Sequence, residues 1–519
     1  MGYYLWRASK LIYNDYIYEY LQLRYLTMNR FIPLIVSFLF TSYLFSQNDT
    51  IENSSVNEPL NTAFKLEKEG KLDEALEILS EYIENDTTNK TAYFLKGNIE
   101  RFKRNYATSI TDYDIAILLD SSYLNAFYNR GLAKSEIGNF RGALMDYKKC
   151  NQIDSSFVKA YISKGGLYIK LKKYESATIE LSKAIQLSKN EASAYLNRAI
   201  AYKELNNLEA ALNDLNAAIL YDSKSLSSYF FRAEIRYKLN DKIGAISDYN
   251  KVIEIEPEHQ QAIINRGHLK KEMLNFTNAI EDYSRILKYD TNQVALYFYR
   301  GEAYMMAGNL SSANHDFQFA LKKDTLNPKA YYYIGLYKHE SNDFEGAISS
   351  YTKAIALDSN YSLAYYERAK TYQEIRDYTN AQDDFTTAID LNPNHLQSYI
   401  QRAKMRVELG EFHAAILDLT KSIQMDSKNI ELYKLSASAK TKLEMNTETK
   451  KEEKESLLKE AIFDLSTAHE LDPKDANILI LRGELRFKSN DKNGACIDWK
   501  NATNLGNKDA LRLIENNCN

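Results

Sequence analysis

The sequence predicts an all-α protein, a right-handed α-solenoid of tandem helix-turn-helix repeats with a C-terminal capping helix. Three observations predict this fold. A long period runs through most of the chain, small and large residues recur at fixed places in it, and only 6 Pro and 18 Gly interrupt 519 residues. A chain of this length exceeds what one hydrophobic core usually serves, so a repeat array or several domains are expected.

Small residues mark one place in the period. Ala143 and Ala177 lie 34 residues apart, and the same spacing continues along the column. The column consists of Ala75, Ser109, Ala143, Ala177, Ala211, Ala245, Ala279, Ala313, Ala347, Ala381 and Ala415, and it resumes at Ala461 and Ala495 after an insertion of 12 residues. We count thirteen units in this register, which indicates a solenoid.

A second small column and a large column accompany the first. Gly97 and Gly131 lie twelve residues before Ser109 and Ala143, and Tyr113 lies four residues after Ser109. Small residues on two helices let their backbones approach closely, and a large residue fills the space beside them. Each unit is therefore predicted to be a helix pair that buries its faces only against its neighbours.

Glycine or asparagine stands between the two predicted helices of many units. Both residues tolerate the left-handed backbone conformation that ends a helix. The column contains Gly70, Gly138, Gly308, Gly410, Asn206, Asn240, Asn342 and Asn490. We expect the first helix of each of these units to end at this place.

These columns resemble the tetratricopeptide repeat, whose helix-turn-helix unit carries the same small and aromatic positions over about 450 residues of this chain. The resemblance implies a right-handed superhelix with a concave inner groove that binds proteins or peptides. We expect the solenoid over residues 56–509 and its cap over residues 510–519. The insertion, near residues 441–452, carries mixed charges that are typical of a solvated helix face or a mobile loop.

A basic column and an acidic column lie sixteen residues apart. Where the base is missing, at Ile334, the acid is missing too, at Ser350; the unit with the insertion breaks this rule, with Ser436 and Asp464. We therefore predict that each pair joins the two helices of one unit, and the alternative is a charged ladder for a ligand. The pairs are Lys96 with Asp112, Arg130 with Asp146, Lys164 with Glu180, Arg198 with Asp214, Arg232 with Asp248, Arg266 with Asp282, Arg300 with Asp316, Arg368 with Asp384, Arg402 with Asp418 and Arg482 with Asp498.

Two adjacent columns on the first helix are aromatic or aliphatic. Adjacent helix residues point about 100° apart, so the two columns serve different surfaces. The resemblance implies that the column from Tyr93 to Tyr433 packs inside the repeats and that the other column points toward the groove. The candidate groove residues are Phe94, Tyr128, Ile162, Leu196, Phe230, Ile264, Phe298, Tyr332, Tyr366 and Ile400.

One known activity of the family is not expected in this chain. Asn98, Asn129 and Lys159 match places at which some members grip a C-terminal carboxylate. Phe94 and Ser163, however, stand where that grip requires lysine and arginine. We therefore expect a protein or peptide ligand that is held in another way.

The sequence shows no catalytic or metal-binding pattern. The seven histidines lie on different units and have no metal-ligand spacing. Phosphate-loop, nucleophile-elbow and zinc-protease motifs are absent. The net charge of -4 is spread along the chain, without a basic stripe for nucleic acid. We expect no enzyme activity, no cofactor, no metal and no nucleic-acid partner.

The N-terminal part has a different character. Residues 28–47 have a positive charge followed by an apolar stretch, the pattern of a secretory signal peptide. Because such a signal belongs at the translation start, we expect residues 1–27 to be an upstream extension absent from the native protein, and residues 48–55 to be a linker. This organisation predicts an exported protein, periplasmic or extracellular. The alternative is an uncleaved membrane anchor formed by residues 31–46.

Two of the three cysteines lie near the C-terminus. Cys496 begins the last second helix, and Cys518 follows the capping helix. If these helices run antiparallel in an oxidising compartment, the two sulfurs meet in a disulfide; the alternative is two free thiols. Cys150 stands in a small-residue column and is expected to be inert.

The sequence therefore predicts a non-catalytic scaffold that binds a protein or peptide in a concave groove. The alternative is a membrane-anchored structural component that organises an envelope complex. The identity of the partner is not encoded in any motif that we recognise.

Overall fold

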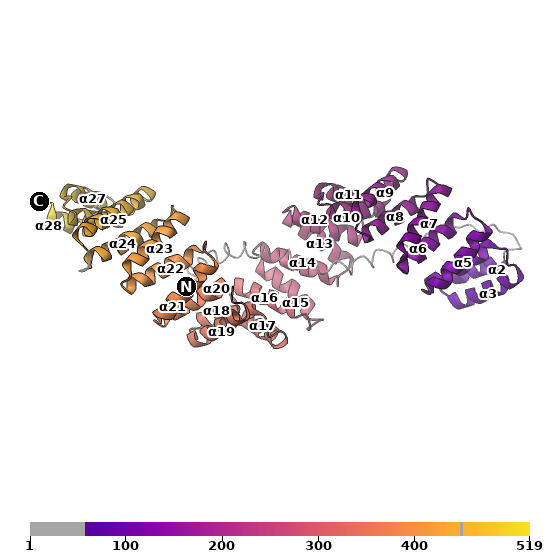
Figure 1. Ribbon diagram of the computed structural model, residues 1–519, viewed down its shortest axis with the longest axis horizontal. Helices are drawn as coiled ribbons and strands as arrows, with labels where there is room; N and C mark the ends of the chain where they lie inside the picture. The colour runs from indigo at the N-terminus through magenta and orange to yellow at the C-terminus, as the bar shows by residue number, and fades with distance from the viewer. Residues whose placement is uncertain (1–57, 447–449, 519) are drawn as a thin grey trace. The chain divides into compact units, whose positions relative to one another are not determined.

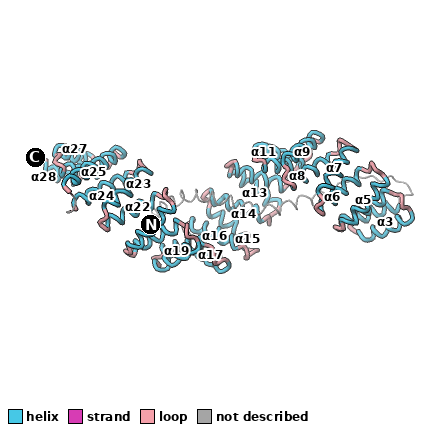
Figure 2. The backbone as a smooth tube through the Cα atoms, in the orientation of Figure 1, coloured by secondary structure: helices cyan, strands magenta, loops and turns pink. Residues whose placement is uncertain are grey.

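The computed structural model describes residues 58–446 and 450–518, and these residues form helices joined by short turns (Figure 1, Figure 2). No strand occurs in this part of the chain. The predicted all-α fold is confirmed. The upstream extension, the signal peptide and the linker that we expect within residues 1–55 lie outside the described residues.

The described helices alternate between a first and a second helix of a pair, as the period predicts. The first helices are α2 (Glu58–Lys68), α4 (Lys90–Phe102), α6 (Leu124–Glu136), α8 (Val158–Lys170), α10 (Ala192–Glu204), α12 (Leu226–Lys238), α14 (Gln260–Glu272), α16 (Val294–Met306), α18 (Pro328–Glu340), α20 (Ser362–Glu374), α22 (Leu396–Glu408), α24 (Ile430–Met445) and α26 (Ala476–Lys488). The second helices are α3 (Leu72–Asn85), α5 (Tyr106–Leu119), α7 (Phe140–Ile153), α9 (Tyr174–Leu187), α11 (Leu208–Tyr221), α13 (Lys242–Ile255), α15 (Phe276–Leu287), α17 (Leu310–Lys323), α19 (Phe344–Leu357), α21 (Tyr378–Leu391), α23 (Phe412–Met425), α25 (Lys451–Leu471) and α27 (Lys492–Asn504). A last helix, α28 (Asp509–Asn517), follows them.

The chain divides into two compact units, Met1–Asp282 and Tyr283–Asn519, and the division falls inside α15. Within each unit, helices that follow one another in the sequence lie side by side (Figure 1). In the first unit α5 packs against both α4 and α6, and in the second unit α25 packs against both α24 and α26. Each unit is a stack of helix pairs whose buried residues form successive hydrophobic clusters, which is the organisation of an α-solenoid.

The small and large columns meet as predicted. The hydroxyl of Ser109 donates to the carbonyl oxygen of Gly97 at 2.8 Å, so the two small columns touch. A Cβ atom added to Gly97 would lie 2.8 Å from Cε1 of Tyr113, and one added to Gly131 would lie 2.6 Å from Cε1 of Tyr147. These distances are shorter than van der Waals contact, so the large ring fills the space that glycine leaves open.

The turn between the helices adopts the left-handed conformation at the predicted column. Gly138 has a φ of 80° and Asn206 a φ of 58°. Four residues that the sequence did not suggest for this conformation share it: Arg104, Lys172, Leu274 and Arg376, with φ between 58° and 63°. The geometry of the helix pair therefore imposes this backbone conformation even on residues whose Cβ disfavours it.

Nine of the ten predicted ion pairs join the two helices of single repeats; Lys96 and Asp112 form no ion pair, and Oδ2 of Asp112 has no hydrogen-bond partner. Nε and Nη2 of Arg130 donate to the two carboxylate oxygens of Asp146 at 3.0 and 2.5 Å. Lys164 reaches Glu180 at 2.7 Å. The same two-point arginine contact recurs at Arg198 with Asp214, Arg232 with Asp248, Arg266 with Asp282, Arg300 with Asp316, Arg368 with Asp384, Arg402 with Asp418 and Arg482 with Asp498.

The third guanidinium nitrogen makes a contact that we did not predict. Nη1 of Arg130 reaches back to Asp114 on the preceding second helix at 2.6 Å. Each arginine therefore links two helix pairs as well as the two helices of its own pair. The other acceptors at this place are Ser182, Asn216, Asn250, Ser284, Thr352, Thr386 and Ser466.

The insertion lengthens one helix pair. Helices α24 and α25 have 16 and 21 residues, compared with 13 and 14 in the preceding pair α22 and α23. Lys450, Lys451 and Glu452 are exposed, as expected for a solvated face. Leu443 is buried, however, and so is Glu444, which bonds to Lys488. The extended α24 thus packs against its neighbours, whereas the charged residues at the start of α25 face solvent as expected.

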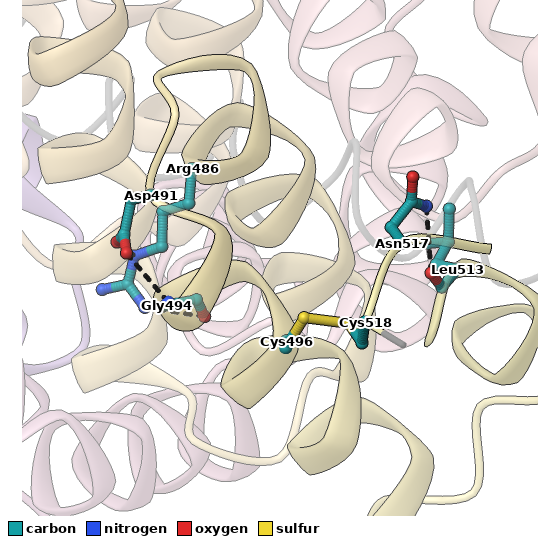
Figure 3. The surroundings of a disulfide bond; sticks show 7 residues. All are labelled: Arg486, Asp491, Gly494, Cys496, Leu513, Asn517 and Cys518. Carbon is teal, nitrogen blue, oxygen red and sulfur yellow. Dashed lines mark hydrogen bonds and ion pairs between the residues drawn. A yellow bond between two sulfur atoms is a disulfide. The ribbon is translucent and has the colours of Figure 1, made fainter. Parts of the chain in front are cut away.

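A disulfide between Cys496 and Cys518 ties the end of α28 to α27 (Figure 3). The two Cα atoms are 5.9 Å apart. Ala510 of α28 is fully buried in the same cluster as Trp499. The capping helix thus covers the last second helix, and the covalent bond fixes its end.

Candidate binding face on the first helices

The candidate groove column packs between repeats. The ring of Phe94 lies 6.1 Å from that of Tyr113 in its own repeat and 5.1 Å from that of Tyr123 at the start of the next first helix. Tyr128 repeats this arrangement with Tyr147 and Phe157, at 5.9 and 5.3 Å. The column therefore forms the core that neighbouring repeats share.

Burial divides the ten candidate groove residues into two sets. One set is at most 8% exposed and consists of Phe94, Leu196, Phe230, Tyr332 and Ile400. The other set is partly exposed and consists of Tyr128, Ile162, Ile264, Phe298 and Tyr366. The buried five offer little surface to a ligand, because neighbouring side chains cover them. For the other five, ligand contact stays a prediction.

The adjacent column, from Tyr93 to Tyr433, points about 100° away from the candidate groove column around the first helix. The aromatic rings of this column make cation–π contacts with the arginines of the ion pairs. The guanidinium carbon of Arg130 is 5.2 Å from the ring centroid of Phe127, and that of Arg232 is 5.4 Å from the centroid of Tyr229. This contact holds the arginine over the ring while it reaches the aspartate. Tyr93, Phe127, Tyr297 and Tyr433 are buried, whereas the other aromatic members of the column are partly exposed.

Polar side chains connect successive first helices. Nδ2 of Asn129 donates to Oδ1 of Asn98 at 2.7 Å, and the hydroxyl of Tyr113 donates to the same oxygen at 2.8 Å. Further links between neighbouring first helices include four at 2.9 to 3.0 Å. We call the five links the first-helix polar pairs: Asn98 with Asn129, Lys203 with Glu234, Tyr237 with Glu272, Glu302 with Tyr333, and His339 with Thr371.

The sequence analysis missed these polar pairs. Asn129 comes directly after Tyr128 in the candidate groove column, and Asn197 and Asn265 occupy the same place in later repeats. Of the paired residues, only Asn129 and Tyr333 lie in this column, so the column by itself does not reveal the polar pairs. Asn98 and Asn129, which matched a carboxylate grip, bond to each other.

Two carboxyl groups near the first repeats have raised pKa values. Burial raises the pKa of Glu67 from 4.5 to about 7, although the charges of Arg101 and Lys68 lower it. Burial raises the pKa of Asp112 from 3.8 to about 6, against the charge of Lys96. Oε2 of Glu67 and Oδ2 of Asp112 are buried without a hydrogen-bond partner. Lys96 therefore acts on Asp112 through its charge alone, without the direct contact that the arginines make with their aspartates.

The described residues show neither a metal site nor a membrane span. Within residues 58–446 and 450–518, no group of three or more His, Cys, Asp and Glu side chains is arranged to hold a metal ion. In the same part of the chain, each helix is too short or too polar to cross a membrane.

Models of repeat families match three parts of the chain. The model described as "TPR repeat" matches residues 337–375, and models described as "Tetratricopeptide repeat" match residues 158–191, 196–259 and 363–395. Each matched segment lies within the helix pairs described above. No curated protein matches the chain.

Solved structures of similar proteins cover parts of the chain. The C-terminal part of a TPR repeat-containing protein from Cytophaga hutchinsonii is 18% identical, covers 46% of this chain and 97% of its own, and has a TM-score of 0.40. YrrB, described as a TPR protein with an unusual peptide-binding site, is 21% identical over 37% of this chain and 97% of its own, with a TM-score of 0.31. Yeast Tom70 is 14% identical over 76% of this chain and 98% of its own, with a TM-score of 0.35.

Proposed function

We propose that this chain, a tetratricopeptide-repeat protein, holds a protein or peptide partner against its first helices and has no catalytic role of its own. Tetratricopeptide repeats generally mediate contacts between proteins. The observation that carries the proposal is the set of first-helix polar pairs, which places amide, hydroxyl and charged groups between successive first helices.

The chemistry of these pairs suits an extended peptide. An asparagine side chain has the same donor and acceptor groups as the peptide backbone. Asn98 and Asn129 are buried and already bonded to each other, so they hold a defined geometry before any partner arrives. Side chains fixed in this way lose little conformational entropy on binding. The charged side chains of the ion-pair columns, in contrast, are already bonded to groups inside and between the repeats.

Export to an oxidising compartment is the second part of the proposal. The disulfide between Cys496 and Cys518 supports it, because such bonds are rare in reducing compartments. The pattern of residues 28–47 supports it independently. Sequencing the N-terminus of the protein from an envelope fraction tests this part: a start near Asn48 agrees with cleavage, and a start before Met28 contradicts it.

Crosslinking tests the binding face. A photoreactive amino acid replaces Lys404 or Gln261, which are exposed on first helices, or Leu118 or Leu417, which are 84% and 71% exposed on second helices. We expect the first-helix positions to yield one and the same crosslinked partner in the envelope fraction. Equal yields of that partner from the second-helix positions would contradict the assignment of the face.

The alternative is a structural component that residues 31–46 anchor in a membrane and that organises an envelope complex. It keeps the same repeats but requires the N-terminal segment to remain attached. Full-length protein that stays with membranes after extraction with high salt would favour this alternative, and soluble mature protein would favour the peptide-binding scaffold.

A further inference from the structure

Exposed basic side chains gather on the repeats that α7, α8 and α9 form in the first unit. Between residues 140 and 189, Glu175 is the one acidic side chain that is exposed, whereas most of the lysines are exposed. Lys148, Lys149 and Lys183 are among them, and their side chains make no ion pair or hydrogen bond with a described residue. This part of the surface therefore carries uncompensated positive charge.

Apolar residues accompany these lysines at equivalent places on two successive second helices. Met145 precedes Lys149 by four residues on α7, and Ile179 precedes Lys183 by four residues on α9. Residues four apart lie on the same face of a helix. Met145 is 65% exposed and Ile179 is 69% exposed. We call Met145, Lys149, Ile179 and Lys183 the second-helix patch, and such a grouping of exposed apolar side chains is typical of an interaction surface.

A hollow of about 560 Å³ opens at the patch. Tyr161 of α8 lines it together with residues of α9 that include Ile179 and Lys183. In the repeat of α16 and α17, Phe319 stands at the place of Lys183, and its ring centroid lies 4.2 Å from that of Tyr297. Tyr297 stands at the place of Tyr161. The hollow is therefore at a place where another repeat packs an aromatic ring of its own.

The joint between α7 and α8 adds a further positive charge beside the patch. At the preceding joint, Nη1 of Arg130 reaches Asp114 at 2.6 Å. One repeat later the same two places hold Lys164 and Lys148. Lys164 bonds to Glu180, the acidic residue that lines the hollow, at 2.7 Å and so compensates its charge. Lys148 has only donors and cannot replace the acceptor, so its ammonium group stays exposed.

We propose that the second-helix patch binds an acidic protein segment that carries an aromatic side chain. The aromatic ring enters the hollow beside Tyr161, as the ring of Phe319 lies against Tyr297, and carboxylates on either side of it meet Lys149 and Lys183. Charge complementarity gives the orientation and speeds the encounter, and burial of the ring contributes affinity. This surface is separate from the first-helix polar pairs, so the inference adds a second binding face to the proposed function.

The test uses the full chain and three labelled, capped pentapeptides in fluorescence anisotropy. One peptide has a central phenylalanine between pairs of glutamates, the second has a central alanine between pairs of glutamates, and the third has a central phenylalanine between pairs of lysines. The patch variant carries Lys149→Gln and Lys183→Gln. Its matched control carries Lys353→Gln and Lys421→Gln, which remove the same charge from exposed, equivalent places on the second helices α19 and α23.

A third variant, Ile179→Ser, tests the hollow. Ser247 and Ser349 occupy this place in other repeats, so serine is compatible with the fold. The change removes an apolar wall of the hollow and leaves the lysines in place. It should weaken binding of the acidic phenylalanine peptide about threefold and leave binding of the alanine peptide unchanged. Equal effects on the two peptides would show that the ring does not enter the hollow.

We expect the acidic phenylalanine peptide to bind most tightly of the three. The patch variant should weaken its binding roughly threefold to tenfold, and the control variant should leave it unchanged. Equal binding of the acidic and basic phenylalanine peptides, or an equal loss in the patch and control variants, would overturn the inference.

Anionic lipid vesicles and single-stranded DNA are measured beside the peptides, because both also carry negative charge. If either of them binds through the patch lysines while no peptide binds, the patch serves another class of partner and the inference is wrong. Failure of all these probes to bind overturns it as well. None of these outcomes decides whether the first helices hold a partner, which the crosslinking experiment tests separately.

Discussion

Lys440 pairs with Asp464, Nζ to Oδ2 at 2.9 Å, in the repeat where Ser436 replaces the usual basic residue. Lys440 lies four residues after Ser436 on α24, so its side chain approaches the same carboxylate from the next helical turn. In the preceding repeat Arg406 has this place and adds a second cation to Asp418 at 2.7 Å. In the repeat that lacks the usual basic residue, Lys440 on the next helical turn therefore supplies the cation that pairs with the aspartate.

Replacing Lys440 by methionine should strongly destabilise the pair α24 and α25. Asp464 is 6% exposed, and the change leaves its carboxylate buried without its cation. Breaking a buried pair in this way costs about 3 to 5 kcal/mol. Hydrogen exchange of the α25 amides measures the effect locally. Lys442→Met is the control, because Lys442 is 42% exposed and 3.8 Å from Glu408; an equal effect of the two variants would contradict the assignment.

The variant Gly131→Ala should destabilise the protein by about 1 kcal/mol. Alanine in a helix interior is normally favoured over glycine by about 1 kcal/mol. Here its Cβ would lie 2.6 Å from Cε1 of the buried Tyr147, and overpacking a core costs about 1 to 3 kcal/mol. Urea denaturation measures the difference.

A second substitution tests the reason for this loss. Adding Tyr147→Leu to Gly131→Ala creates the combination that Ala199 and Leu215 already form in another repeat. The double variant should recover stability relative to Gly131→Ala. A single alanine variant that is more stable than the parent would show that the ring moves aside without cost.

The variant Arg376→Gly should stabilise the turn between α20 and α21 by about 1 kcal/mol. Arg376 is exposed and has a φ of 62°, a conformation that costs a residue with a Cβ roughly 1 to 2 kcal/mol. Gly138→Ala, at a φ of 80°, should have the opposite effect. Thermal unfolding of both variants checks the two signs together, and the same sign for both would refute the argument.

The first two repeats should lose stability as the pH rises. The pKa values of Glu67 and Asp112 are raised on folding, from 4.5 to about 7 and from 3.8 to about 6. The folded state therefore binds more protons than the unfolded state between about pH 4 and pH 7, so stability is greatest at the acid end of this window and falls toward pH 7. Hydrogen exchange of α2 to α5, corrected for the intrinsic rate, measures the change. Glu67→Gln should remove most of it; an unchanged pH profile in that variant would contradict the assignment.

The disulfide should stabilise the capping helix. It closes a loop of 22 residues, which corresponds to about 3 kcal/mol in the chain-entropy model. Cys518→Ser should therefore increase hydrogen exchange in α28 and leave α20 unchanged. Thiol titration offers a second check. Burial raises the pKa of Cys150 to about 12, so the native protein should show no reactive thiol, the unfolded protein one, and the reduced unfolded protein three.

The sequence predicted correctly those contacts that form within a single helix pair. Gly97 and Tyr113, or Arg402 and Asp418, are sixteen residues apart and belong to one helix pair, so their contact follows from the period. The burial of the candidate groove column could not be predicted in the same way, because its environment depends on the next repeat. Phe94 is covered by Tyr123, and the helical period alone cannot show which of two adjacent columns that neighbour covers.

The positions of the first-helix polar pairs were unpredictable for a related reason. Asn98 and Asn129 are 31 residues apart and come from different repeats, and their pairing depends on how one first helix is offset from the next. The left-handed Arg376 shows the same limit, since its conformation is imposed by the two helices and contradicts its own preference.

The double role of the arginines bears on how such an array changes length during evolution. Arg198 and Asp214 belong to the same helix pair. Duplication or loss of a whole unit therefore adds or removes both charges together, and neither is left without its partner. The backward contact survives as well, because the preceding helix offers a polar acceptor at this place whether the residue is Ser182, Asn216 or Thr352. Units are therefore interchangeable at their joints, and unequal recombination between copies of the repeat can lengthen or shorten the chain without creating a buried, uncompensated charge.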